Sequence, residues 1–249
     1  MTLSSHEHAA AGVAPRAPDV SILIPVYNEE SLLRSAIVDL IDRLDTSHTY
    51  EIVLAENGST DGTLDIAAEL EERFDLVRHE HTDEPNYGKA LRRAILGARG
   101  RWVVCDEIDL CDVDFHRQAL ALLEAGEADL VIGSKTMDGA SDERPVLRRA
   151  GTVVINGMLR AALGFRGTDT HGLKAFRADA LRDVARACLV DRDLFASELV
   201  IRAERAGVAV REIPIRVLEK RPPSVHLVRR VPHVIRGLTR LFVAIRIKG

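Results

Sequence analysis

Residues 102–110 read WVVCDEIDL, an apolar run that breaks directly into three carboxylates within four residues. The apolar part predicts a buried strand, and acids crowded at the end of such a strand repel one another and lose hydration. If the extended geometry continues, Glu107 and Asp109 point the same way while Ile108 faces the core. We therefore expect a compensating cation here, and two oxygen ligands suit Mg²⁺ or Mn²⁺ carrying a diphosphate.

Outward from this run, strand patterns alternate with helix patterns along the chain. This alternation predicts an α/β fold with a Rossmann-like, mostly parallel central sheet and helices on both faces. Ligands bind beyond the carboxyl ends of such strands, and three polar segments fall there, at 25–29, 56–61 and 106–109. We expect strands at 20–26, 51–55, 76–79, 102–105, 130–132 and 208–213, and helices at 29–44, 63–73, 89–98, 115–125, 146–163, 179–188 and 195–206.

Length and composition limit the class of protein. With 249 residues and 46% hydrophobic content the chain can bury a full core, and the formal net charge of −4 gives no argument for nucleic-acid binding. Three cysteines without zinc-type spacing favour a reduced, cytoplasmic protein. We divide the chain into a disordered tail (1–18), one domain (19–225) and a basic amphipathic helix (226–249).

The helix expected over 227–245 has two interpretations. It places apolar residues on one face and arginines on the other, which suits peripheral contact with the anionic inner face of a membrane. Its stripe could equally pack on the domain or on a second copy in a homodimer, and packing is the more common use of such a stripe. No run approaches the roughly 20 apolar residues that span a bilayer.

Six motifs, in order and spacing, resemble the family 2 glycosyltransferases of the GT-A fold, closest to the dolichyl- or polyprenyl-phosphate mannose synthase branch. Each motif alone is weak evidence, but the ordered set is specific. The resemblance extends over roughly residues 20–224. The motifs are Ile24-Pro25-Val26-Tyr27-Asn28-Glu29-Glu30, Glu56-Asn57-Gly58-Ser59-Thr60-Asp61-Gly62-Thr63, Tyr87-Gly88-Lys89-Ala90, Glu107-Ile108-Asp109-Leu110, Val131-Ile132-Gly133-Ser134-Lys135 and Thr170-His171-Gly172-Leu173-Lys174-Ala175-Phe176.

The first motifs are expected to hold the nucleotide of a sugar donor. Tyr27 offers a ring and a hydroxyl beside the base, and Glu56 can accept hydrogen bonds from a base or a ribose. Asp61 is either a direct ligand or the cap of the next helix. The resemblance assigns nucleotide-sugar binding to Pro25, Tyr27, Glu29, Glu56, Gly58, Asp61, Lys89, Glu107 and Arg221.

The acidic motif departs from the family pattern. The family has Asp-x-Asp where this chain has Glu107-Ile108-Asp109, and we expect Glu107 and Asp109 to be the metal ligands. The branch often has a third polar ligand where this chain has Cys111, a poor partner for Mg²⁺, so we expect either that Asp112 or water substitutes or that the metal is held weakly. The resemblance places positive charge for the phosphates at Lys135, Arg149 and Arg221.

The reaction implied is that of an inverting glycosyltransferase of the hexosyltransferase type, with Asp109, Lys135, Arg149 and Asp169 as catalytic residues. A polyprenyl phosphate acceptor is already an anion and needs no strong base. A soluble hydroxyl acceptor would need one, with Asp169, His171 and Glu198 as candidates and a structural turn as the alternative role of His171. A non-catalytic GT-A binding protein is a further alternative. A sugar nucleotidyltransferase is disfavoured because no glycine-rich loop follows the first strand.

Overall fold

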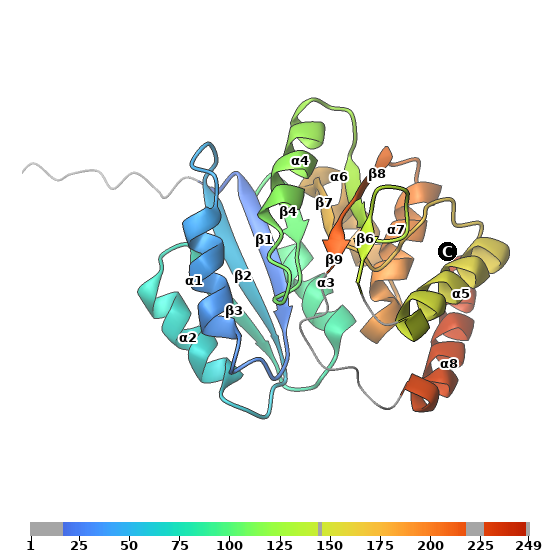
Figure 1. Cartoon of the computed structure of the whole chain (residues 1–249), viewed down its shortest axis with the longest axis horizontal. Helices are drawn as coiled ribbons and strands as arrows, with labels where there is room; N and C mark the ends of the chain where they lie inside the picture. The colour runs from blue at the N-terminus through green and yellow to red at the C-terminus, as the bar shows by residue number, and fades with distance from the viewer. Residues whose placement is uncertain (1–16, 144–145, 218–226, 248–249) are drawn as a thin grey trace, which may run out of the picture.

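A seven-stranded sheet organises the part of the chain that the computed structural model describes, residues 17–143, 146–217 and 227–247 (Figure 1). Its strand order is β3-β2-β1-β4-β7-β5-β8, and β1 pairs in parallel with both β2 and β4. The strands are β1 (Val20–Val26), β2 (Tyr50–Asn57), β3 (Val77–Thr82), β4 (Trp102–Cys105), β5 (Leu130–Ser134), β7 (Lys174–Arg177) and β8 (Val210–Pro214). A separate ribbon pairs β6 (Ser141–Asp142) with β9 (Arg216–Val217).

Helices cover both faces of the sheet, as the alternating pattern predicts. The sheet divides the core in two, so that within β1 Ile22 and Ile24 join one cluster of buried side chains while Leu23 joins the other. The first cluster lies under α1 (Leu33–Arg43), α2 (Thr63–Arg73) and α4 (Val113–Glu124). The second lies under α3 (Tyr87–Gly97), α5 (Val146–Leu163), α6 (Ala178–Ala187), η1 (Arg192–Leu194), α7 (Phe195–Arg205) and α8 (Leu227–Arg246).

Strand β7 is the strand of the central sheet that sequence patterning did not predict. It is antiparallel to both of its neighbours, β4 and β5. The chain enters it through Gly172, where an added Cβ would lie 1.7 Å from the carbonyl oxygen of Gly133. The amide of Gly133 in turn donates to the carbonyl of Leu173 at 2.8 Å. This close backbone contact fixes the position of the segment immediately before β7.

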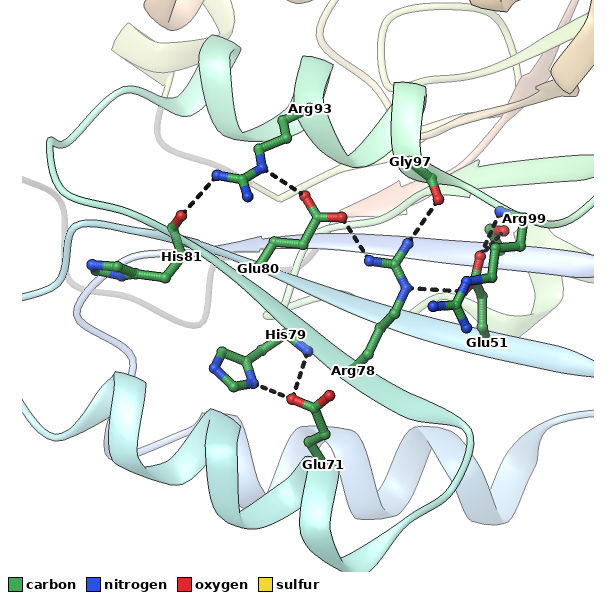
Figure 2. A network of polar contacts seen from close by, with 10 residues as sticks. Glu51, Glu71, Arg78, His79, Glu80, His81, Arg93, Gly97 and Arg99 are labelled. Carbon is green, nitrogen blue, oxygen red and sulfur yellow. Dashed lines mark hydrogen bonds and ion pairs between the residues drawn. The ribbon is translucent and has the colours of Figure 1, made fainter.

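Edge strand β3 is held by charged side chains (Figure 2). Arg78 donates to Glu51 of β2 at 2.9 Å and to Glu80 at 2.6 Å, and also reaches the carbonyl of Gly97 at the end of α3. Arg93 of α3 donates to the carbonyl oxygen of His81 at 3.1 Å. Charges along an edge strand discourage pairing with another sheet, and here they also tie α3 to the strand.

The C-terminal helix packs on the domain over its described second half. Leu241, Ala244 and Ile245 are buried in the core, and Arg202 and Arg205 of α7 donate to the carbonyls of Ala244 and Ile245. The packing interpretation of this stripe is therefore confirmed for these residues. None of the described helices combines the length and apolar character needed to cross a membrane. Of the expected tail, residues 1–16 lie outside the described residues.

The contact at Gly172 generates a stability prediction. Gly172→Ala should lower the free energy of unfolding by about 3 kcal/mol, because the new methyl group forces backbone apart. Gly151→Ala is the matched control, since a Cβ there meets nothing within 4 Å and alanine favours a helix. Urea unfolding of both variants measures the difference. Equal midpoints for Gly172→Ala and the parent would contradict the close contact.

Candidate functional site

A cavity of about 510 Å³ opens where β1, β2 and β4 end. All three predicted segments reach it: residues 25–29 at the end of β1 and just beyond it, Asn57 at the end of β2, and the acidic segment after β4. Lys135, which directly follows β5, and His171 complete its polar lining. The residues that line it are Pro25, Val26, Tyr27, Glu29, Asn57, Tyr87, Asp106, Glu107, Ile108, Asp109, Lys135, His171 and Ala196.

The acidic segment forms a turn, so the extended geometry expected for it was wrong. The amides of Leu110 and Cys111 donate to the carbonyl of Glu107 at 2.9 and 3.1 Å, and Cys111 has a φ of +44°. Glu107 and Asp109 nevertheless both line the cavity. The turn therefore brings both carboxylates to the cavity, although the segment is not the extended strand that was expected.

Asp106 holds this turn from inside the protein. Its carboxylate is fully buried and meets Nε2 of His116, on α4, at 2.5 Å. The other oxygen accepts the amide of Glu107 at 2.7 Å. Asp106 thus supports the turn rather than serving as a ligand. His116 is a site-supporting residue that sequence reasoning missed, because nothing in the pattern of α4 distinguishes it from a core residue.

Two lysines balance the acids. Burial raises the pKa of Glu107, and the charges of Asp109 and Asp106 raise it further, while Lys135 and Lys174 oppose the shift. Lys135 lies 3.9 Å from the carboxylate of Asp169 and donates to the carbonyl of His171 at 3.4 Å. Lys174 is buried in β7, donates to the carbonyl of Gly172 at 2.8 Å, and has its pKa lowered by burial. The cavity therefore joins negative and positive charge at low solvent exposure.

Two carboxylates fit a magnesium or manganese ion that arrives with phosphates. Mg²⁺ is usually bound by one or two carboxylates together with substrate phosphates and water, which is what Glu107 and Asp109 can offer. No cluster of three or more acidic, histidine or cysteine ligands occurs among the residues described. The cation would therefore be held incompletely by this chain alone.

Neither of the two residues considered for the position of a third metal ligand lines the cavity. Cys111 is buried and its thiol contacts the carbonyl of Ile108 at 3.6 Å. Asp112 caps α4 by accepting the amide of Phe115 at 2.9 Å, a local bond that an aspartate before a helix commonly makes. Asp112 does not line the cavity, so its substitution for the third ligand stays a prediction, beside water and a weakly held metal.

Glu56 supports a loop rather than facing a base. Its fully buried carboxylate accepts the amides of Ser59 at 2.6 Å and Gly58 at 3.2 Å and pairs with the ring of His81. Burial would raise the pKa of Glu56, but these hydrogen bonds outweigh it and the pKa is lowered. Gly58 has a φ of +69° and packs against the backbone of Glu84. Both residues therefore shape the loop beside the cavity.

The loops after β1 and β2 are bonded to each other. Asn28, with a φ of +53°, accepts the amide of Thr60 at 2.8 Å and donates its own amide to Ser59. Asp61 accepts the amide of Thr63, the first residue of α2, at 3.0 Å, and the amide of Glu30 at 3.3 Å. The N-cap of α2 is Gly62, so these bonds place Asp61 in the turn that precedes the cap, and its contact with a ligand stays a prediction.

Other predicted residues lie away from the cavity lining. Lys89 pairs with Glu84 at 3.0 Å on the surface, and Arg149 is exposed on α5. Asp169 is fully buried behind Lys135 and accepts the amide of His171 at 2.8 Å. Arg221 and its loop lie outside the described residues. The roles expected for Lys89, Arg149 and Arg221 stay predictions.

Comparisons with known proteins agree on one family. The model of the family described as glycosyl transferase family 2 matches residues 21–184. Glycosyltransferase AglD of Haloferax volcanii is 31% identical over 90% of this chain and 37% of its own length. Dolichyl-phosphate beta-glucosyltransferase ALG5D of Trichomonas vaginalis is 29% identical over 79% of this chain and 64% of its own. The chain thus spans between about a third and two thirds of these relatives.

Solved structures confirm the fold. Glucosyl-3-phosphoglycerate synthase from Mycobacterium tuberculosis, crystallised with Mn²⁺, uridine diphosphate and glucosyl-3-phosphoglycerate, superposes with a TM-score of 0.63. The match covers 91% of this chain and 79% of that one at 20% identity. A mycobacterial protein of known structure gives a TM-score of 0.64 at 22% identity, over 90% and 74% of the two chains. The expected GT-A architecture is confirmed at this level.

The Asp106–His116 contact predicts a cost for removing the imidazole. His116→Ala leaves a buried carboxylate oxygen without its partner, which should lower the free energy of unfolding by about 1–3 kcal/mol. Arg117→Ala, one residue along α4 and paired with Asp114 only at the surface, should change it by less than about 1 kcal/mol. Denaturant titration of both variants checks this, and equal losses would refute the supporting role of His116.

The Glu56–His81 pair predicts a pH dependence. The hydrogen bond between the two side chains raises the pKa of His81 above 6.5, while the pKa of Glu56 is lowered below 4.5. The stability that His81 contributes is therefore full below about pH 6.5 and is lost as the pH rises through its raised folded value. Unfolding from about pH 6 to about pH 9 should show a larger loss for the parent than for His81→Asn. Identical slopes would show that the pair does not titrate as described.

Proposed function

The chain belongs to glycosyl transferase family 2, and on that basis we propose that it transfers a sugar, with inversion, from a nucleotide-diphosphate sugar to a polyprenyl phosphate. The observation that carries the proposal is the meeting of Glu107, Asp109 and Lys135 in one cavity at the carboxyl ends of the strands. Paired carboxylates can hold a cation against a diphosphate, and an ammonium beside them can stabilise the charge of the leaving group.

Donor binding would use both sides of the cavity. Tyr27 lines the cavity and is 41% exposed, and it would offer a ring to the base. Glu107 and Asp109 would hold Mg²⁺ or Mn²⁺, which would neutralise the diphosphate and favour its departure. Lys135, kept in place by Asp169 and by the carbonyl of His171, would stabilise the departing phosphate.

The surroundings of the candidate bases favour an anionic acceptor. Glu198 is fully buried, and its carboxylate accepts the amides of Leu189 and Val190 and pairs with Arg202. Asp169 is also fully buried. Of the three candidate bases only His171 lines the cavity. A phosphate needs no base to act as nucleophile, and Lys135 would attract it. The name of the Trichomonas vaginalis relative, a dolichyl-phosphate glucosyltransferase, supports this choice.

Transfer to a soluble hydroxyl acceptor is the second candidate, because His171 lies in the cavity and a hydroxyl would need such a base. A non-catalytic binding protein on the same fold is the third. Its motivation is that Glu107 stands where the family has an aspartate.

A sugar-transfer assay tests the catalytic proposal. The full chain is incubated with Mn²⁺, a panel of nucleotide sugars and a short polyprenyl phosphate, and transfer of the sugar to the polyprenyl phosphate is measured. Asp109→Asn and Lys135→Gln should each lower the rate by at least about 100-fold, because each removes charge that stabilises the leaving group. Asp114→Asn, an exposed aspartate on α4 that does not line the cavity, is the matched control.

Three outcomes separate the candidates. Transfer to polyprenyl phosphate that survives in His171→Ala supports the phosphate acceptor. Transfer only to hydroxyl compounds, lost in His171→Ala, would replace it by the second candidate. Tight binding of a nucleotide sugar without any turnover, unaffected by metal, would favour the non-catalytic protein.

A further inference from the structure

One wall of the cavity takes no part in the donor contacts proposed above. Tyr87, the first residue of α3, and Ala196, the second residue of α7, both line the cavity. Tyr87 is partly buried and packs on the core, and Ala196 is buried. We call these two residues the α3–α7 wall. It combines an aromatic ring with one of the smallest side chains.

Close packing of α3 against α7 brings the two residues of the wall together. A Cβ added to Gly88 would lie 2.6 Å from the Cβ of Phe195 and 2.7 Å from the backbone nitrogen and oxygen of Arg192. Because only glycine permits this approach, the first turn of α3 lies directly against η1 and the start of α7. Tyr87 precedes the glycine and Ala196 follows the phenylalanine. The same contact therefore places both residues on one side of the cavity.

A buried asparagine holds this arrangement. The side chain of Asn86, the N-cap of α3, accepts the amides of Lys89 at 3.1 Å and Arg192 at 3.0 Å. The amide of Asn86 donates to the side chain of Asn57 at 2.5 Å, and Asn57 lines the cavity at the end of β2. Arg192 has a φ of +61°, a conformation that persists only where the surroundings hold it. The α3–α7 wall is therefore fixed relative to the end of β2.

The rest of the lining indicates what the wall contacts. Tyr27 is the residue proposed for the base, and Glu107, Asp109 and Lys135 are those proposed for the cation and the diphosphate. The sugar ring is the part of a nucleotide-sugar donor that these contacts leave without a partner. The lining that they leave unused is the α3–α7 wall together with His171.

We propose that the α3–α7 wall receives the sugar ring of the donor and determines which sugars are accepted. A pyranose presents C–H groups on its faces, which the ring of Tyr87 can cover. The methyl group of Ala196 leaves room for ring substituents that a larger side chain would exclude. The inference rests on the proposed function for the identity of the donor, and it adds the residues that recognise the sugar.

Calorimetric titration with ligands that differ only in the sugar tests the proposal. The full chain with Mn²⁺ is titrated with uridine and guanosine diphosphates and with their glucose and mannose derivatives. Tyr87→Leu keeps apolar packing on the core but removes the ring. It should lower the affinity for the preferred nucleotide sugar about tenfold and that for the diphosphate by less than about twofold. Tyr50→Leu is the matched control, because Tyr50 begins β2 at the end opposite the cavity.

A second variant tests the space beside the ring. Ala196→Val should also weaken the nucleotide sugar and not the diphosphate, because the added methyl groups occupy room that the sugar needs. Circular dichroism of the variants checks the fold, and if Ala196→Val does not fold, Tyr87→Leu decides alone.

Two results would overturn the proposal and leave the donor site in place. In the first, the folded variants bind both kinds of ligand with the affinity of the parent, so the wall does not contact the sugar. In the second, Tyr87→Leu weakens the diphosphate as much as the nucleotide sugar, which would assign the wall to the nucleotide. A parent that binds neither kind of ligand would instead reject the proposed function, and the inference with it.

Discussion

The contact between Asp106 and His116 determines how β4 ends, and the site depends on that ending. Both side chains are buried, and the 2.5 Å contact joins the strand to α4. Because Asp106 also accepts the amide of Glu107, the next residues leave the sheet in a fixed turn. That turn presents Glu107 and Asp109 to the cavity. Buried acids are tolerated only where charge or hydrogen bonds compensate them, and here His116, Lys135 and Lys174 supply that compensation.

Much of the fold could be predicted from the sequence because apolar residues recur with a different period in its strands and in its helices. Helices 63–73 and 146–163 and strand 102–105 have the predicted bounds. Strand β7 was missed because its four residues begin with Lys174 and end with Arg177, so the segment lacks the apolar run of a buried strand. Its antiparallel pairing depends on contacts with β4 and β5, which are distant in sequence and leave no local pattern.

Site residues at or near the carboxyl ends of strands were predicted correctly. The roles of acids that accept hydrogen bonds from nearby backbone amides were not. Glu107, Asp109, Lys135, Tyr27, Pro25 and Glu29 all line the cavity. Glu56, Asp61 and Asp112 instead accept nearby backbone amides, a use of short acidic side chains that competes with ligand binding. Sequence alone cannot decide between these uses, because both place an acid at the same point of a loop. His116 and Lys174 were missed as supporting residues for a different reason, since their roles arise only from tertiary contact.

We propose that Glu107 and Asp109 form half of a cation site, which a nucleoside diphosphate completes. Calorimetric titration of the chain with Mn²⁺, with and without saturating uridine or guanosine diphosphate, tests it most directly. We expect weak or undetectable Mn²⁺ binding to the chain alone and at least about tenfold tighter binding with one of the nucleotides present, because phosphate oxygens supply the missing ligands. Equal Mn²⁺ affinity in all three titrations would contradict it.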